Sequence, residues 1–144
     1  MTKVKESVEM TAPDNTAIEV IKDSSIAYCS MVANTKEEKI ALYNATSNPE
    51  ARLGDMVGEE INVVHIVFEM ITVKDDTGLE TQAPRIILID DNGKSYTAVS
   101  WGIYNSLKNV FRYIDNPPFN PPLKIKVMQI VKGAKRTLQL RVVS

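Results

Sequence analysis

The chain has 144 residues and a mass of 16.0 kDa, which is the size of one ordinary domain. Apolar residues make up 44% of the sequence and charged residues 24%, a composition that excludes a disordered or fibrous protein. A single cysteine cannot form an internal disulfide, which suits a reducing compartment such as a cytosol. One cysteine and one histidine also exclude nearly every zinc site built within one chain.

The net charge of −1 hides a segregation of charge along the chain. Six of the 17 basic residues and none of the 18 acidic residues lie between Asn116 and Ser144. That segment therefore carries +6, and the first 115 residues carry −7 (11 basic against 18 acidic). A cationic surface for a polyanion explains this pattern, and so does a basic edge hairpin whose lysines discourage aggregation. Charge alone leaves both interpretations open.

Residues 1–22 are polar and weakly patterned, with a turn signal at Pro13–Asn15, and we interpret them as an N-terminal arm. The arm is acidic overall, which makes it a poor direct ligand for DNA. Its short apolar residues are Ala17, Ile18, Val20 and Ile21. Because they suit pairing with a sheet edge, we expect the arm to serve self-association or partner docking. Residues 23–144 then form one domain.

Three strands are predicted in the first half of the domain. Ile26–Val32 and Ile40–Ala45 are the first two, with a solvated turn at Lys36–Lys39 between them. The run Glu60–Lys74 is rich in β-branched residues and apolar on both alternation phases. This pattern predicts a long strand that packs against the core on one face and is available for binding on the other. The run is too short and too polar to span a bilayer, so we expect no membrane contact.

A hairpin is predicted next. A turn at Asp75–Gly78 ends the long strand, and we expect a loop from there to Pro84. Arg85–Asp90 and Ser95–Val99 flank an Asn92-Gly93 pair. An Asn-Gly pair between two β-rich runs is the strongest short hairpin signal, because both residues tolerate a positive φ.

One helix and a second hairpin complete the domain. Ser100 is a suitable N-cap, and a proline pair after Asn116 ends the helix. The apolar face of the helix comprises Ile103, Leu107, Val110, Phe111 and Ile114. Two alternating strands follow around Gly133, with inward residues Leu123, Ile125, Val127, Leu138, Leu140 and Val142. The opposite face of this hairpin is polar and largely basic.

The element order predicts a mainly β fold, an OB-like five-stranded antiparallel barrel with one helix between strands 3 and 4 and an N-terminal arm. An unrelated α+β sheet sandwich is the structural alternative, which the number of strands does not exclude. The sequence offers little for catalysis. Cys29 and His65 lack a third orienting group, and the pairs Asp75-Asp76 and Asp90-Asp91 sit at turns, where aspartate bonds its own backbone. We therefore expect neither an enzyme nor a cofactor or metal.

Aromatic rings interleaved with cations favour single-strand binding, in which unpaired bases stack on rings and cations follow the phosphates. The candidates on predicted strands are Tyr28, Tyr43, Phe68, Met70 and Tyr96, and Trp101 and Tyr104 open the helix. For each strand ring, packing inside the barrel is the competing interpretation. The candidate cations are Lys124, Lys126, Lys132, Lys135, Arg136 and Arg141.

The run from Ile87 to Ser100, with its acidic-Gly turn and the string Ser-x-Tyr-x-Ala-x-Ser into a helix, resembles the single-stranded DNA-binding proteins of protein-primed, Bacillus-type phages. The resemblance covers roughly residues 38–144. It implies an OB-like barrel that coats and protects displaced strands during phage DNA replication. By this resemblance Tyr96 replaces a tyrosine that contacts DNA, whereas Met70 stands where the family has another tyrosine, and Phe68 is then the nearest ring.

The resemblance also implies partners and a location. Single-stranded DNA is the expected ligand, phage DNA polymerase or other replication proteins are candidate partners, and the arm is a candidate for homo-oligomer formation. The expected location is the cytoplasm of the infected bacterial host. The alternative function is a phage accessory or structural interaction module whose basic hairpin meets an acidic partner.

Overall fold

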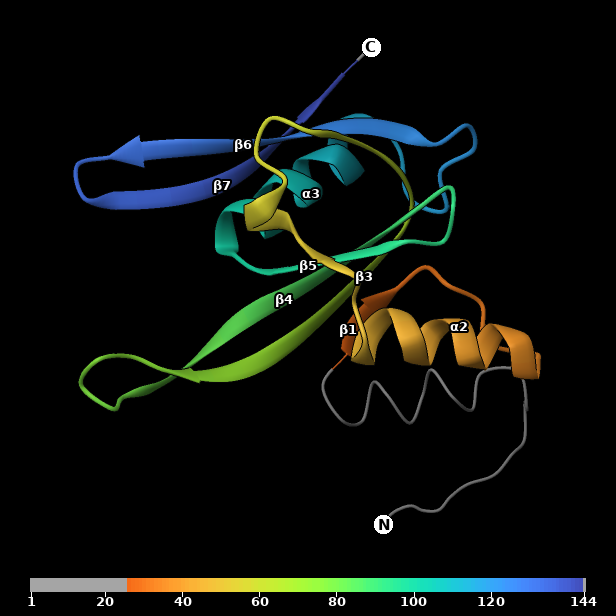
Figure 1. The fold of residues 1–144 in the computed structure, drawn as a ribbon, viewed down its shortest axis with the longest axis horizontal. Coiled ribbons are helices and arrows are strands. Elements are labelled where there is room, and N and C mark those ends of the chain that lie inside the picture. Colours follow the sequence, from red (N-terminus) through yellow and green to blue (C-terminus); the bar gives the residue numbers. More distant parts are fainter. Residues whose placement is uncertain (1–25, 144) are drawn as a thin grey trace.

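A computed structural model describes residues 26–143, and the predicted arm of residues 1–22 lies outside the described residues (Figure 1). In chain order the described elements are β1 (Ile26–Cys29), α2 (Lys36–Ser47), β2 (Ala51–Arg52), a 3-10 turn (Leu53–Asp55), β3 (Glu60–Lys74), β4 (Glu80–Asp90), β5 (Ser95–Val99), α3 (Trp101–Tyr113), β6 (Leu123–Lys132) and β7 (Lys135–Val142). The predicted mainly β class is confirmed.

The strands form one curled sheet in the order β2-β5-β4-β3-β6-β7, with β1 paired to β3 (Figure 1). All neighbours are antiparallel except β2 and β5, which are parallel. The run from β3 to β7 has the predicted chain order, with α3 after its third strand. The five-stranded arrangement is wrong, since the described chain adds β1, β2 and α2 to this run. Strand β1 confirms the strand predicted at Ile26–Val32, although it ends at Cys29.

Helix α2 replaces the turn predicted at Lys36–Lys39 and the strand predicted at Ile40–Ala45, so both predictions are wrong. A capping box begins the helix: the Thr35 hydroxyl accepts a hydrogen bond from the Glu38 N–H at 3.1 Å, and the Glu38 carboxylate accepts one from the Thr35 N–H at 2.9 Å. This Thr-x-x-Glu signature is a helix start that is visible in the sequence. It satisfies backbone donors that a helix otherwise leaves unpaired.

The core lies on both sides of the sheet. The larger cluster, between the sheet and α3, includes Ile66, Phe68, Ile86, Leu88, Ile103 and Leu107. The smaller cluster lies between the sheet and α2 and comprises Ala33, Leu42, Ala45, Val67, Ile87 and Ile89. The middle of β3 is therefore buried on both faces. The prediction that one face of this strand is free for use is wrong there, because α2 covers it.

One half-buried arginine fixes α2 on the sheet. Arg85 of β4 donates to the Glu69 carboxylate on β3 at 2.7 Å, and it also donates to the Thr46 carbonyl near the end of α2 at 2.7 Å. Both charged side chains are less than one-fifth exposed. The ion pair therefore joins two strands, and the same guanidinium donates a hydrogen bond to the end of α2.

Two similar turns close the hairpins on either side of β4. Asp75 Oδ1 accepts hydrogen bonds from the N–H groups of Thr77 and Leu79, and Asp90 Oδ1 accepts from those of Asn92 and Lys94, all at 2.9 Å. The predicted hairpin around Asn92-Gly93 is confirmed. The loop predicted up to Pro84 is wrong, since β4 already begins at Glu80. Aspartates that bond their own turn are the structural interpretation that the sequence favoured.

The C-terminal third agrees with the sequence. The Ser100 hydroxyl caps α3 by accepting from the Ile103 N–H at 3.1 Å, and Ile103, Leu107 and Val110 are buried. Strands β6 and β7 pair without a register break, and Gly133 at their turn has a φ of 62°. The helix and terminal hairpin predictions are thus confirmed, except that α3 ends at Tyr113 and leaves Ile114 of the predicted apolar face 50% exposed.

Candidate nucleic-acid interface

The basic residues gather on one face of the hairpin formed by β6 and β7. The register places Lys126 opposite Arg141 and Lys132 opposite Lys135. Since alternate residues of a strand share a face, that face carries Lys124, Lys126, Lys132, Lys135 and Arg141. We call this set the basic face. Arg136 is opposite Val131 and so lies on the other side of the hairpin.

The basic face borders one acidic residue of the neighbouring strand. Strand β6 pairs on its other side with the start of β3, where Glu60 is opposite Lys126 and Asn62 is opposite Lys124. Lys132 and Lys135 lie farther along the hairpin, at its tip, which projects from the body of the domain (Figure 1), whereas Arg141 lies beside Lys126. The predicted clustering of the cations is therefore present in three dimensions.

Tyr96 is buried, with 6% of its surface exposed. Its hydroxyl donates a hydrogen bond to Asp90 Oδ2 at 2.9 Å. Burial, and then the bond to Asp90, raise the pKa of Tyr96 to about 12. In this conformation its ring offers no face to a base, so the DNA contact at Tyr96 stays a prediction.

Phe68 is also buried, at the centre of a cluster of aromatic rings. Its ring centroid lies 5.6 Å from that of Tyr28, 5.3 Å from Tyr104 and 5.9 Å from Phe111. These separations are typical of packed aromatic pairs. Burial raises the pKa of the Tyr28 hydroxyl, which agrees with its place in this cluster. The four rings join α3 to β1 and β3 and hold the core together.

The other two predicted stacking residues lie apart from the basic face. Met70 is half-buried on β3, beyond Phe68, and Tyr43 is 62% exposed on α2. The structure therefore brings five of the six predicted cations together on the basic face, with Arg136 on the other side of the hairpin. The predicted stacking residues are separated: Tyr96 and Phe68 are in the core, Met70 is on β3 and Tyr43 is on α2.

Two exposed rings lie at the ends of α3. Trp101 is 51% exposed and makes a T-shaped contact with Tyr104, whose centroid is 5.5 Å away. Tyr113 is 75% exposed, and the Arg112 guanidinium lies 5.9 Å from its centroid. Tyr113 was not among the predicted stacking residues, which lie on predicted strands or at the start of the helix. A signal was present, since Trp101 and Tyr113 fall outside the apolar face of the predicted helix.

A family model described as phage single-stranded DNA-binding protein matches residues 21–142. The chain belongs to this phage single-stranded DNA-binding protein family. No curated protein and no solved structure matches it. The resemblance that the sequence suggested is therefore confirmed at the level of the family, and single-strand binding in phage replication is the function that the family carries.

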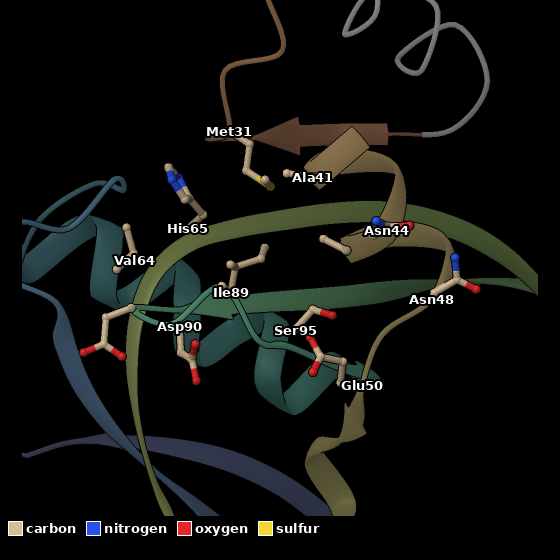
Figure 2. A pocket seen from close by; sticks show the side chains of 13 residues that line it. Met31, Ala41, Asn44, Asn48, Glu50, Val64, His65, Ile89, Asp90 and Ser95 are labelled. Atoms are coloured by element: carbon tan, nitrogen blue, oxygen red, sulfur yellow. The ribbon is translucent and has the colours of Figure 1, made fainter. Parts of the chain in front are cut away.

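For a phage single-stranded DNA-binding protein, the cavity beneath α2 is a poor phosphate site. Figure 2 shows this cavity of about 480 Å³, with Asn44 of α2 and its C-cap Asn48 on one side and strand residues on the other. Its lining includes Glu50, Asp90 and Asp91 and contains no lysine or arginine. Such a surface repels phosphates, whereas the basic face attracts them.

His65 lines the same cavity and lies 3.1 Å from the Ser30 hydroxyl through Nδ1. Burial lowers the pKa of His65. Within residues 26–143, no three histidine, cysteine or acidic side chains gather in a way that could hold a metal ion. In the same part of the chain, no helix is long and apolar enough to cross a membrane.

Proposed function

We propose that this protein coats and protects displaced single strands during phage DNA replication, with little sequence preference, in the cytoplasm of the infected host cell. The observation that carries the proposal is the basic face of a family member whose family binds single-stranded DNA. Phosphates are the same in every sequence, so a surface that contacts them tolerates any strand. We assign the cations of the basic face, with Arg136, to phosphate contacts.

The topology supports a location for the bound single-stranded DNA. In OB folds, oligonucleotides bind to the face of strands 2 and 3 and to the loops joining strands 1–2 and 4–5. If the run β3–β7 is the OB-like barrel, these loops are the turn at residues 75–79 and the turn around Gly133. Both hairpins project toward the left of Figure 1. The second turn is flanked by Lys132 and Lys135 of the basic face.

Base stacking supplies the second part of the proposed mechanism. Among the predicted positions, Tyr43 and Met70 have side chains that solvent reaches, but Tyr43 lies on α2, apart from the basic face, and we assign it no base. Tyr96 and Phe68 would have to leave the core before a base could stack on them. Partner docking and homo-oligomer formation through the arm, and contact with phage DNA polymerase, belong to the same proposal.

The test is a titration with poly(dT) at several salt concentrations. If three to five cations neutralise phosphates, the slope of log affinity against log salt is about −2 to −3.5, at ~0.7 per phosphate for single strands. Duplex DNA should bind much more weakly because its bases are already stacked. A slope near zero, or no oligonucleotide binding at all, would contradict the proposal and favour the interaction-module alternative.

A further inference from the structure

A groove of about 640 Å³ runs along the junction of α3 and β7. The exposed rings Trp101 and Tyr113 lie at the two ends of its helical wall. Asn105 and Asn109 lie between them. The groove has no part in the phosphate contacts proposed above.

The helical wall is regular. Trp101, Asn105, Asn109 and Tyr113 follow one another at intervals of four residues, so they lie along one side of the helix. Trp101 and Tyr113 are twelve positions apart, so at 1.5 Å per residue their backbone positions are separated by roughly 18 Å along the helix axis. At the ~3.4 Å rise of stacked nucleotides, this distance is about five nucleotides, and fewer in an extended strand.

The opposite wall is the edge strand of the sheet, held close to the helix. A Cβ at Gly102 would overlap the carbonyl oxygen of Leu138, so only glycine allows this approach. One turn later, the Ser106 hydroxyl accepts a hydrogen bond from the Leu140 N–H at 3.1 Å. These two contacts fix the helix against the strand, so the groove is preformed.

The charge around the groove suits a polyanion. Its lining contains no acidic residue. On β7 the groove is lined by Leu140 and Val142 of the inward face and by Thr137 and Gln139, and the latter two share the basic face with Lys135 and Arg141. Along β7, the uncharged residues Thr137 and Gln139 thus lie between Lys135 and Arg141 on the same face.

We propose that this groove binds the bases of the single strand whose phosphates the basic face contacts. This inference rests on the proposed function. Bases stack on Trp101 and Tyr113, and the amides of Asn105 and Asn109 hydrogen-bond to base edges. Every base has a π-face, and an amide both donates and accepts, so this groove holds any sequence.

The first measurement uses the only tryptophan of the chain, which lies at the end of this groove. Titration of the full chain with a 15-mer of thymidine should quench its fluorescence in parallel with binding measured by anisotropy of a labelled oligonucleotide. Trp101→Ala and Tyr113→Ala should each weaken that binding roughly 5- to 150-fold. Trp101→Phe keeps a ring and should recover most of the affinity.

Two controls isolate stacking. Ile40→Ala truncates a side chain on α2 that is 49% exposed, close to the 51% of Trp101, and it should leave affinity unchanged. An abasic 15-mer keeps the phosphates but has no bases. Wild type should bind it more weakly than the thymidine 15-mer, and the Trp101 and Tyr113 variants should bind it as wild type does.

The outcomes separate the two proposals. If wild type binds the 15-mer without quenching, and both alanine variants bind as tightly as wild type, the groove inference is overturned while the proposed function stands. If wild type does not bind the 15-mer, the proposed function fails and the groove inference fails with it. If thermal melting shows that Trp101→Ala is unfolded, Tyr113→Ala decides the result, because that ring is 75% exposed.

Discussion

Helices α2 and α3 cover opposite sides of one sheet, and the surfaces beside them differ in charge. Both helices begin at a hydroxyl N-cap, Thr35 for α2 and Ser100 for α3, and each borders a hollow. The cavity beside α2 has three acidic residues and no cation in its lining, whereas the groove beside α3 has no acidic residue and adjoins the basic face. Only the α3 side suits a polyanion.

This difference shows how the distribution of charge along the sequence determines the distribution of charge on the folded surface. The cations of the C-terminal segment fall in a single hairpin, so they stay together after folding. Within residues 26–143, Glu50, Asp90 and Asp91 line the cavity beside α2 and Asp75 lies in a hairpin turn, while Glu60 borders the basic face. Electrostatic repulsion would keep a DNA strand away from the surface beside α2 and leave it for roles in stability.

The strongest test of a structural role for the α2 side is Arg85→Ala. The change leaves the Glu69 carboxylate largely buried without its partner and removes a donor from the end of α2. We expect the free energy of unfolding, measured in urea, to fall by about 3 kcal/mol. Affinity for the thymidine 15-mer should stay within about twofold, because this side does not face the DNA in our proposal.

Arg52→Ala is the matched control for that loss. Its ion pair with Asp55 spans 3.5 Å, but both side chains are more than two-thirds exposed. An exposed pair contributes about 0–1 kcal/mol, so unfolding should change little. If Arg85→Ala instead left stability unchanged and weakened DNA binding, the division between the two sides would be wrong.

The second test removes two cations from each side. Lys132→Ala with Lys135→Ala should reduce the salt slope by about 1.4, because each cation that neutralises a phosphate adds ~0.7 to the slope. Lys36→Ala with Lys39→Ala removes the same charge from the exposed face of α2, and the slope should hardly change. Equal effects from the two pairs would mean that net charge, and not the basic face, determines binding.

The two sides also differ in how far the sequence predicted them. The apolar spacing of α3 follows the period of a helix, and the alternation in β6 and β7 follows that of a strand, so both were predictable. Helix α2 buries only Leu42 and Ala45 among the described residues, so no apolar stripe marks it. Its capping box was the one local signal, and it outweighs a weak β pattern once the helix packs on the sheet.

The rings show a different limit. Alternation assigns Tyr96 and Ala98 to one face of β5 and Ser95 and Thr97 to the other, but it does not say which face points inward. The structure turns Tyr96 into the core, where Asp90 satisfies its hydroxyl. That pairing depends on a turn six residues away, so the burial of a polar ring could not be derived from strand periodicity alone.

The third test therefore removes only the hydroxyl of this buried ring. Tyr96→Phe loses the hydrogen bond to Asp90 and keeps the packing, so the free energy of unfolding should fall by about 1 kcal/mol. Affinity for the thymidine 15-mer should not change, whereas Tyr113→Ala should show the reverse pattern. Weaker DNA binding by Tyr96→Phe at unchanged stability would restore the DNA contact that the family resemblance implied.

The smallest expected effect is the pH dependence of the α2 side. Burial lowers the pKa of His65 below its ordinary value of 6.5, so the unfolded chain takes up a proton at a higher pH than the folded chain. Stability is therefore full above pH 6.5 and declines as the pH falls through 6.5 toward the folded pKa. Urea unfolding between pH 5.5 and 7.5 should show this decline, and His65→Gln should flatten it.

DNA binding should not follow the same curve. His65 is the only histidine in the chain and lines the cavity beside α2, while lysine and arginine keep their charge throughout this pH range. Affinity for the thymidine 15-mer should thus stay constant from pH 7.5 to 5.5 wherever the protein remains folded. A loss of affinity that disappears in His65→Gln would instead connect the α2 side to the DNA site, because no other side chain of ordinary pKa titrates in that interval.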